Sequence, residues 1–176
     1  FLARPVRLIP YAAEALPTVS DDGRTYTLRV RPGLLYAPHP AFGGKPREVT
    51  AQDFVYSVKR IADPVSISMS FAQFEGLIEG LDDLVAAARR EKRGLDYSAP
   101  IAGLQALDAR TLRIRLTRPD PTFIYGLAYA GWSAVPREVV EAEKAEFARR
   151  PIGSGPFVVE RFQPGTKLVL VRNPSS

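Results

Sequence analysis

Apolar and polar residues alternate along residues 25–31, which predicts a strand, because successive side chains of a strand point to opposite faces. The apolar members are Tyr26, Leu28 and Val30, and threonine and arginine lie between them. The stretch that follows, residues 34–49, contains three prolines and two glycines. We expect it to form a loop.

Apolar residues recur at helical spacing in two later stretches. The first is residues 51–62, and Thr50 and Asp53 at its start have the pattern of a capping box. This segment therefore predicts a helix that ends before a proline. The second stretch runs over residues 74–88. Its two glycines weaken the first turns, and we expect a firm helix only from Leu81.

The rest of the chain mixes strands and helices. Two strands are predicted at residues 104–107 and 111–117, and helices at residues 122–130 and 137–149. A hairpin of residues 157–162 and 167–172 closes the chain. Since the strands lie mostly in antiparallel hairpins that pack with helices, we expect the α+β class.

Composition narrows the function classes. The 176 residues contain no cysteine and carry a formal net charge of +5. Disulfides and thiolate chemistry are therefore excluded. A basic chain could be an interaction module for nucleic acid or an acidic protein. However, its arginines are scattered along the sequence and form no contiguous stripe, so we expect no nucleic-acid partner.

No catalytic, metal or cofactor site is predicted. His39 is the sole histidine and lies between prolines in the predicted loop, where a surface histidine is the simplest interpretation. Ser154 lies between two glycines but lacks the strand-turn-helix context of a nucleophile elbow. A hydrolase would need a nucleophile and base pair that the sequence does not offer, and we expect no enzyme.

Five motifs in order resemble the family-5 bacterial extracellular solute-binding proteins, the oligopeptide- and dipeptide-binding group. The first resembles the family's "S-D-D-G-x-x-Y-T-F-x-L-R-x-G" strand, the second its "V-T-A-x-D-V-x-Y-S-x-x-R-x-x-D-P" helix, and the fourth its "P-I-G-T-G-P-Y" turn. The third and fifth resemble its "D-x-x-T-L" hairpin and its "L-x-R-N-P" strand end. In this chain the motifs occupy residues 19–33, 49–64, 107–112, 151–157 and 170–174. The loop Tyr36–Phe42 departs from the family's usual wording, which leaves the ligand class open.

The resemblance implies a fragment of a type II-like periplasmic binding protein. Residues 1–130 would form the smaller second domain and residues 131–176 part of the first domain. The protein would be a monomer, periplasmic or lipid-anchored, that captures peptides and delivers them to the permease of an ABC importer. A third domain outside the chain would complete the cleft. A sugar or a metal chelate remains the alternative ligand within the family.

Four residues are candidate ligand contacts. The resemblance places ligand-side contacts of the second domain in the loop that carries Met69, Phe71 and Phe74. Trp132, the only tryptophan, follows a glycine and could form the floor of a binding pocket. Core packing is the alternative for Phe71, Phe74 and Trp132.

Overall fold

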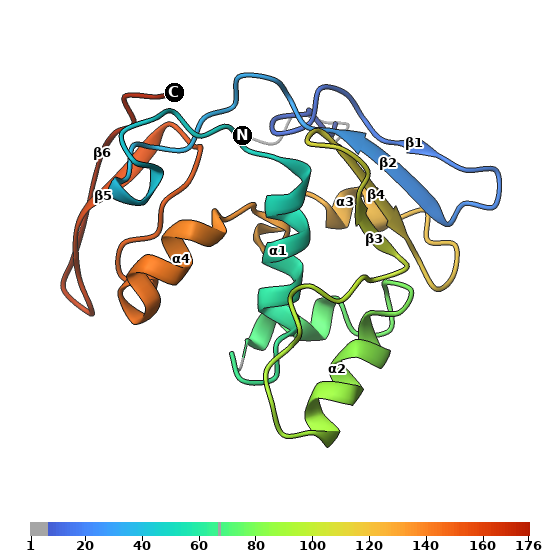
Figure 1. The fold of residues 1–176 in the computed structure, drawn as a ribbon. Coiled ribbons are helices and arrows are strands. Elements are labelled where there is room, and N and C mark those ends of the chain that lie inside the picture. Colours follow the sequence, from blue (N-terminus) through green and yellow to red (C-terminus); the bar gives the residue numbers. More distant parts are fainter. Residues whose placement is uncertain (1–6, 67) are drawn as a thin grey trace.

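The larger sheet of the structure has four antiparallel strands. The computed structural model describes residues 7–66 and 68–176. The sheet has the order β1-β2-β4-β3, and the strands are β1 (Thr18–Val19), β2 (Thr25–Arg29), β4 (Thr111–Arg115) and β3 (Leu104–Ala106) (Figure 1). The strand predictions for residues 25–31, 104–107 and 111–117 are confirmed to within a few residues.

The β2–β4 register separates apolar from polar side chains. Tyr26 pairs with Ile114 and Leu28 with Leu112, whereas Thr27 pairs with Arg113 on the opposite face. Tyr26, Leu112 and Ile114 are buried. Since side chains directly across an antiparallel pair share a face, one face of the sheet becomes the core and the other faces water.

Helix α1 (Ala51–Ala62) covers the buried face and contacts both β3 and β4. It begins at the predicted capping box, where the Asp53 carboxylate accepts a hydrogen bond from the backbone N–H of Thr50 at 2.8 Å. Val58, in the middle of α1, is completely buried. Both the helix and its capping box are therefore confirmed.

Helix α2 (Leu81–Arg90) packs below the sheet through Leu81, Val85 and Ala88, which are buried (Figure 1). It starts at Leu81, as predicted. Gly80 precedes it with φ 80, a conformation that glycine adopts at no steric cost. Short 3-10 helices occupy Pro40–Phe42 and Met69–Gln73.

The C-terminal part lies on the other side of α1 from the sheet (Figure 1). It contains α4 (Arg137–Glu143) and a separate two-stranded sheet of β5 (Phe157–Gln163) and β6 (Lys167–Arg172). The predicted hairpin is thus confirmed. One face of the hairpin is apolar and largely exposed, with Phe157 at 62% and Leu168 at 56%.

Two helix predictions were too long. The segment predicted as one helix over residues 122–130 forms a single turn, α3 (Phe123–Gly126), and then a 3-10 turn at Ala130–Trp132. Glycine inside a helix costs about 1 kcal/mol relative to alanine, and Gly126 and Gly131 mark this interruption. The predicted helix over residues 137–149 changes at Lys144, which has φ 49, into a 3-10 helix (Lys144–Ala148).

A three-residue ion-pair cluster, the Arg47 clasp, joins the two sides of α1. Arg47 lies 2.7 Å from the Asp53 carboxylate and 2.7 Å from the carboxylate of Glu138 at the start of α4. Next to it, the Ser57 hydroxyl accepts the Val135 backbone N–H at 2.9 Å. The loop before α1, α1 itself and α4 are therefore held by direct bonds.

Charge and burial compete within the Arg47 clasp. Partial burial opposes ionisation of Glu138, but the backbone N–H at the start of α4 and the Arg47 guanidinium outweigh it. Together they hold the pKa of the Glu138 carboxyl below its usual value. Burial raises the pKa of Tyr36, whose ring lies beneath the Arg47 guanidinium at 5.7 Å. Glu138 is therefore ionised at neutral pH.

Replacing Gly103 by alanine should destabilise the sheet. An added Cβ would lie 2.5 Å from the Arg115 carbonyl oxygen and 2.6 Å from the Glu79 backbone nitrogen. Both are backbone atoms that cannot move aside, so we expect a loss of about 2–3 kcal/mol of unfolding free energy in urea. Gly126→Ala, whose Cβ would meet nothing within 4 Å, is the control and should change stability by less than about 0.5 kcal/mol. Equal losses in the two variants would contradict the steric explanation.

Removing the guanidinium of the clasp should also be costly. Arg47→Ala leaves the Asp53 carboxylate, whose side chain is 4% exposed, without its cation. Breaking a buried pair in this way costs about 3 kcal/mol. Arg149→Ala removes an ion pair with Glu146 in which both side chains are more than half exposed, and should cost less than about 0.5 kcal/mol. Chemical unfolding at neutral pH measures both losses. If Arg47→Ala leaves the unfolding free energy unchanged, the clasp does not stabilise the fold.

Candidate functional site

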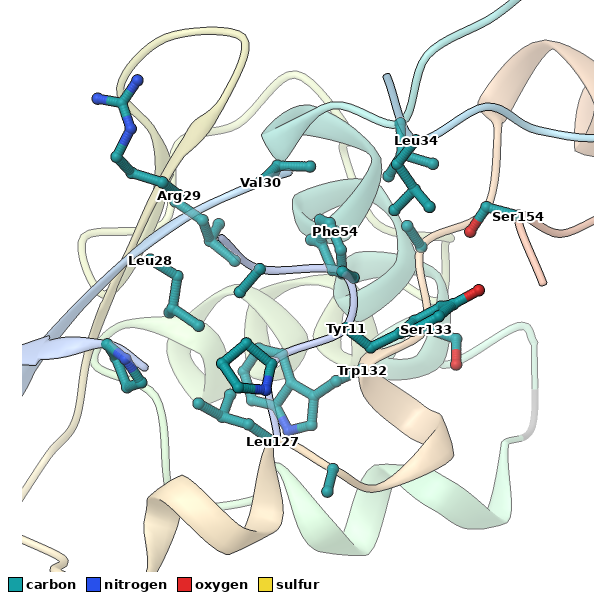
Figure 2. A pocket seen from close by; sticks show the side chains of 18 of the residues that line it. Tyr11, Leu28, Arg29, Val30, Leu34, Phe54, Leu127, Trp132, Ser133 and Ser154 are labelled. Carbon is teal, nitrogen blue, oxygen red and sulfur yellow. The ribbon is translucent and has the colours of Figure 1, made fainter. Parts of the chain in front are cut away.

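A cavity of about 580 Å³ lies between the sheet and the C-terminal part. It is bounded by the segment 8–17, the end of β2, Phe54 of α1, and residues 124–134 (Figure 2). Gly153, Ser154 and Gly155 close the side toward the hairpin. Segments that are distant in the sequence therefore form this site together.

The cavity wall is mainly apolar. Among its lining residues in the described part of the chain, Arg29 alone is charged. Figure 2 shows its guanidinium directed away from the cavity, and it pairs with Glu14 at 3.2 Å. Hydroxyl groups in the lining are carried by Tyr11, Tyr129, Ser133 and Ser154. Figure 2 labels Tyr11, Ser133 and Ser154. Such a wall suits an uncharged, largely apolar group with a few hydrogen-bonding atoms.

Trp132 lies at the cavity and is supported from behind by Phe74. Trp132 is 7% exposed and lines the cavity, whereas Phe74 is 1% exposed and does not. Their ring centroids are 5.1 Å apart, and Phe123 meets Trp132 edge-on at 5.7 Å. These contacts fix the indole in one orientation. The core alternative that we kept open therefore describes Phe74, and Trp132 combines core packing with access to the cavity.

The other two predicted residues lie outside this cavity. Met69 is 96% exposed on its 3-10 helix. Phe71 is half-buried, and the guanidinium of Arg89 lies over its ring at 5.7 Å. The structure thus brings Phe74 and Trp132 together and leaves Met69 and Phe71 on another surface. Ligand contact by any of the four stays a prediction.

The sequence analysis missed the segment 8–17 and the cavity-facing role of Gly153-Ser154-Gly155. The sequence identified this turn as a family motif and excluded a nucleophile elbow, but its place in the cavity wall depends on the packing of the C-terminal part. One backbone contact illustrates this: the Ala37 N–H donates to the Gly153 carbonyl at 3.0 Å. No local pattern in the sequence signals such a contact.

Ser154 lines the cavity, whereas His39 contacts an acidic side chain and a backbone N–H group. The His39 ring lies 3.2 Å from a Glu143 carboxylate oxygen, and its Nδ1 accepts the Ala41 N–H. Within residues 7–66 and 68–176, no three His, Cys, Asp or Glu side chains gather in a way that could hold a metal ion. In the same part of the chain, no helix combines the length and apolar composition needed to cross a membrane.

Comparison with known proteins identifies the family. The family model described as "Bacterial extracellular solute-binding proteins, family 5 Middle" matches residues 7–175. The chain belongs to this family. Its members are solute-binding proteins, so the resemblance carried by the five motifs is confirmed.

The relatives of this chain include proteins that are named for peptide binding. The chain is 35% identical over 158 residues to the periplasmic murein peptide-binding protein MppA of Escherichia coli, covering 88% of this chain and 26% of MppA. It is 29% identical over 174 residues to the dipeptide-binding protein of E. coli, covering 92% of this chain and 28% of that protein. The family-5 chain therefore spans about a quarter of the length of these relatives.

Solved structures confirm the fold class. The E. coli murein tripeptide binding protein MppA aligns with a TM-score of 0.74 and 30% identity over 97% of this chain and 30% of that chain. The substrate-binding domain of an oligopeptide ABC transporter from Bacillus anthracis aligns with a TM-score of 0.77 and 22% identity, over 99% of this chain and 31% of that chain. The family-5 chain thus has the mixed helices and antiparallel sheets of a type II periplasmic binding protein.

Proposed function

We propose that this family-5 chain is part of the substrate-binding component of an ABC importer. In this proposal the complete protein works as a monomer outside the cytoplasmic membrane, captures peptides, and delivers them to the permease. The observation that carries the proposal is the family match over residues 7–175. The names of its relatives, which specify oligopeptides, dipeptides and a murein peptide, support peptides as the ligand class.

The cavity supports a role in contacting the ligand. Its apolar wall and its hydroxyl groups match an uncharged peptide side chain attached to a polar backbone. Trp132 offers a large apolar surface that is already held in place by Phe74 and Phe123. A group fixed before binding loses little conformational entropy when the ligand arrives. We therefore place one apolar side chain of the peptide against Trp132.

We further propose that residues 1–130 form one domain and residues 131–176 part of another. The four-stranded sheet, α1 and α2 lie in the first range, and α4 with the β5–β6 hairpin in the second. The exposed apolar face of the hairpin supports its being part of a larger domain, because a two-stranded hairpin alone is marginally stable in water. The Arg47 clasp crosses this boundary through Glu138.

Peptide capture can be tested with the full-length protein by isothermal titration calorimetry. We expect peptides of two to five residues to bind with micromolar or tighter affinity, and a panel of sugars and metal chelates to give no heat of binding. Saturable binding of a sugar or a chelate in place of every peptide would replace the proposed ligand class.

Filling the cavity tests its role separately. Ser133→Trp places a large ring at an exposed position of the cavity wall, and we expect peptide affinity to fall at least about tenfold through steric exclusion. Gln163→Trp adds the same ring at an exposed position of β5 and should leave affinity unchanged. If peptides bind both variants as tightly as the unmodified protein, the cavity is not the ligand contact, while peptide capture itself stands.

A further inference from the structure

The C-terminal end of α2 carries three exposed cations that follow one another closely. We name Arg89, Arg90 and Lys92 the basic tip. In the described part of the chain, the ion pair at this end joins Arg93 to Glu91, and none joins a carboxylate to a residue of the basic tip. The basic tip thus presents positive charge that the surrounding structure does not neutralise.

The nearby acids are engaged elsewhere. Asp63 is buried, and its carboxylate accepts hydrogen bonds from the Val65 and Leu95 backbone N–H groups and from the Tyr97 hydroxyl. Asp96 accepts the backbone N–H and the hydroxyl of Ser98. Neither carboxylate has a hydrogen bond to the basic tip.

Helix electrostatics accounts for only part of this charge. The C-terminus of a helix carries roughly half a negative charge, which favours a cation in the last turn. One cation is enough to balance it. Three cations exceed this requirement, so the basic tip is a local positive surface that attracts anionic groups.

An apolar surface adjoins the basic tip. Met69 is 96% exposed and Val65 is 64% exposed. The Arg89 guanidinium lies over the Phe71 ring at 5.7 Å, which joins α2 to the 3-10 helix of Met69. Gly94, just beyond the basic tip, lies against the Val65 side chain and Asp63. These contacts connect the basic tip, at the lower end of α2 in Figure 1, to the segment that carries the exposed apolar side chains.

The same 3-10 helix reaches back to the cavity. The Phe74 N–H donates to the Phe71 carbonyl at 2.8 Å, and Phe74 packs on Trp132. The basic tip, Phe71, Phe74 and Trp132 thus form a continuous series of contacts from the exposed end of α2 to the cavity wall. A ligand that binds at the basic tip touches elements that also support Trp132.

We infer that the basic tip, together with Met69 and Val65, binds peptides that carry a carboxylate side chain beside an apolar one. Guanidinium groups donate paired hydrogen bonds to a carboxylate, and the flexible thioether of methionine adapts to apolar side chains of different shape. This inference rests on the proposed peptide capture and adds a preference for acidic peptides.

The test uses the full-length protein and two tetrapeptides with amidated C-termini, one with glutamate beside leucine and one with glutamine in its place. At low salt we expect the glutamate peptide to bind about 5–10-fold more tightly, and this preference to disappear at about 0.5 M salt. In Arg90→Gln/Lys92→Gln the glutamate peptide should weaken to the affinity of the glutamine peptide, which itself should not change.

The control variant is Lys45→Gln/Lys167→Gln, which removes the same charge from exposed positions on the loop before α1 and on the hairpin. It should keep the preference for glutamate. Equal binding of the two peptides to the unmodified protein, or equal loss in the two double variants, would overturn the acidic preference and leave peptide capture intact. Failure of both peptides to bind would overturn the proposed function and the preference together. Binding to vesicles of anionic lipid that depends on the basic tip, without discrimination between the peptides, would replace the peptide by a membrane surface.

Discussion

The antiparallel register between β2 and β4 is the constraint on which the rest of this family-5 structure depends. Tyr26 and Leu28 face the core only because they pair with Ile114 and Leu112. A slip of one residue would turn threonine and arginine inward and leave the apolar side chains in water. The face that this register creates is the surface on which α1 packs, and α1 in turn carries Phe54 into the cavity wall and Asp53 into the Arg47 clasp.

The Arg47 clasp transmits this order to the C-terminal part. A single guanidinium binds a carboxylate on α1 and another at the start of α4. Because the Arg47–Asp53 pair is largely shielded from water, its geometry is better defined than that of a surface ion pair. The cavity forms where the elements on the two sides of α1 meet. Its shape therefore depends on how the clasp and the Ser57–Val135 hydrogen bond hold the C-terminal part against α1.

Charge is distributed in a way that separates two surfaces. The cavity is lined by apolar side chains and a few hydroxyl groups, whereas the basic tip adjoins exposed methionine and valine. The positive charges behind the net charge of +5 are thus not spread evenly over the molecule. Most of the arginines are scattered along the sequence, but Arg89, Arg90 and Lys92 lie within four consecutive positions at the end of α2 and form one local cluster.

Local patterns in the sequence were sufficient for much of the fold. The period of two in β2, the capping box of α1, the glycine before α2 and the turn of the hairpin depend on neighbouring residues, and each was predicted from them. The family could also be inferred from five ordered motifs. The shortened α3 and the break at Lys144 were not predicted, because short helices depend on tertiary packing more than on propensity.

The sequence by itself therefore determined most of the secondary structure, the α+β class and the family. Tertiary structure alone decided which candidate residues share a site: Trp132 reaches the cavity, Phe74 supports it from the core, and Met69 lies exposed beside the basic tip. It also brought the segment 8–17 and the turn at Ser154 to one cavity. The physical reason is that strands, caps and turns depend on bonds between near neighbours, whereas a cavity depends on contacts between segments that are far apart along the chain.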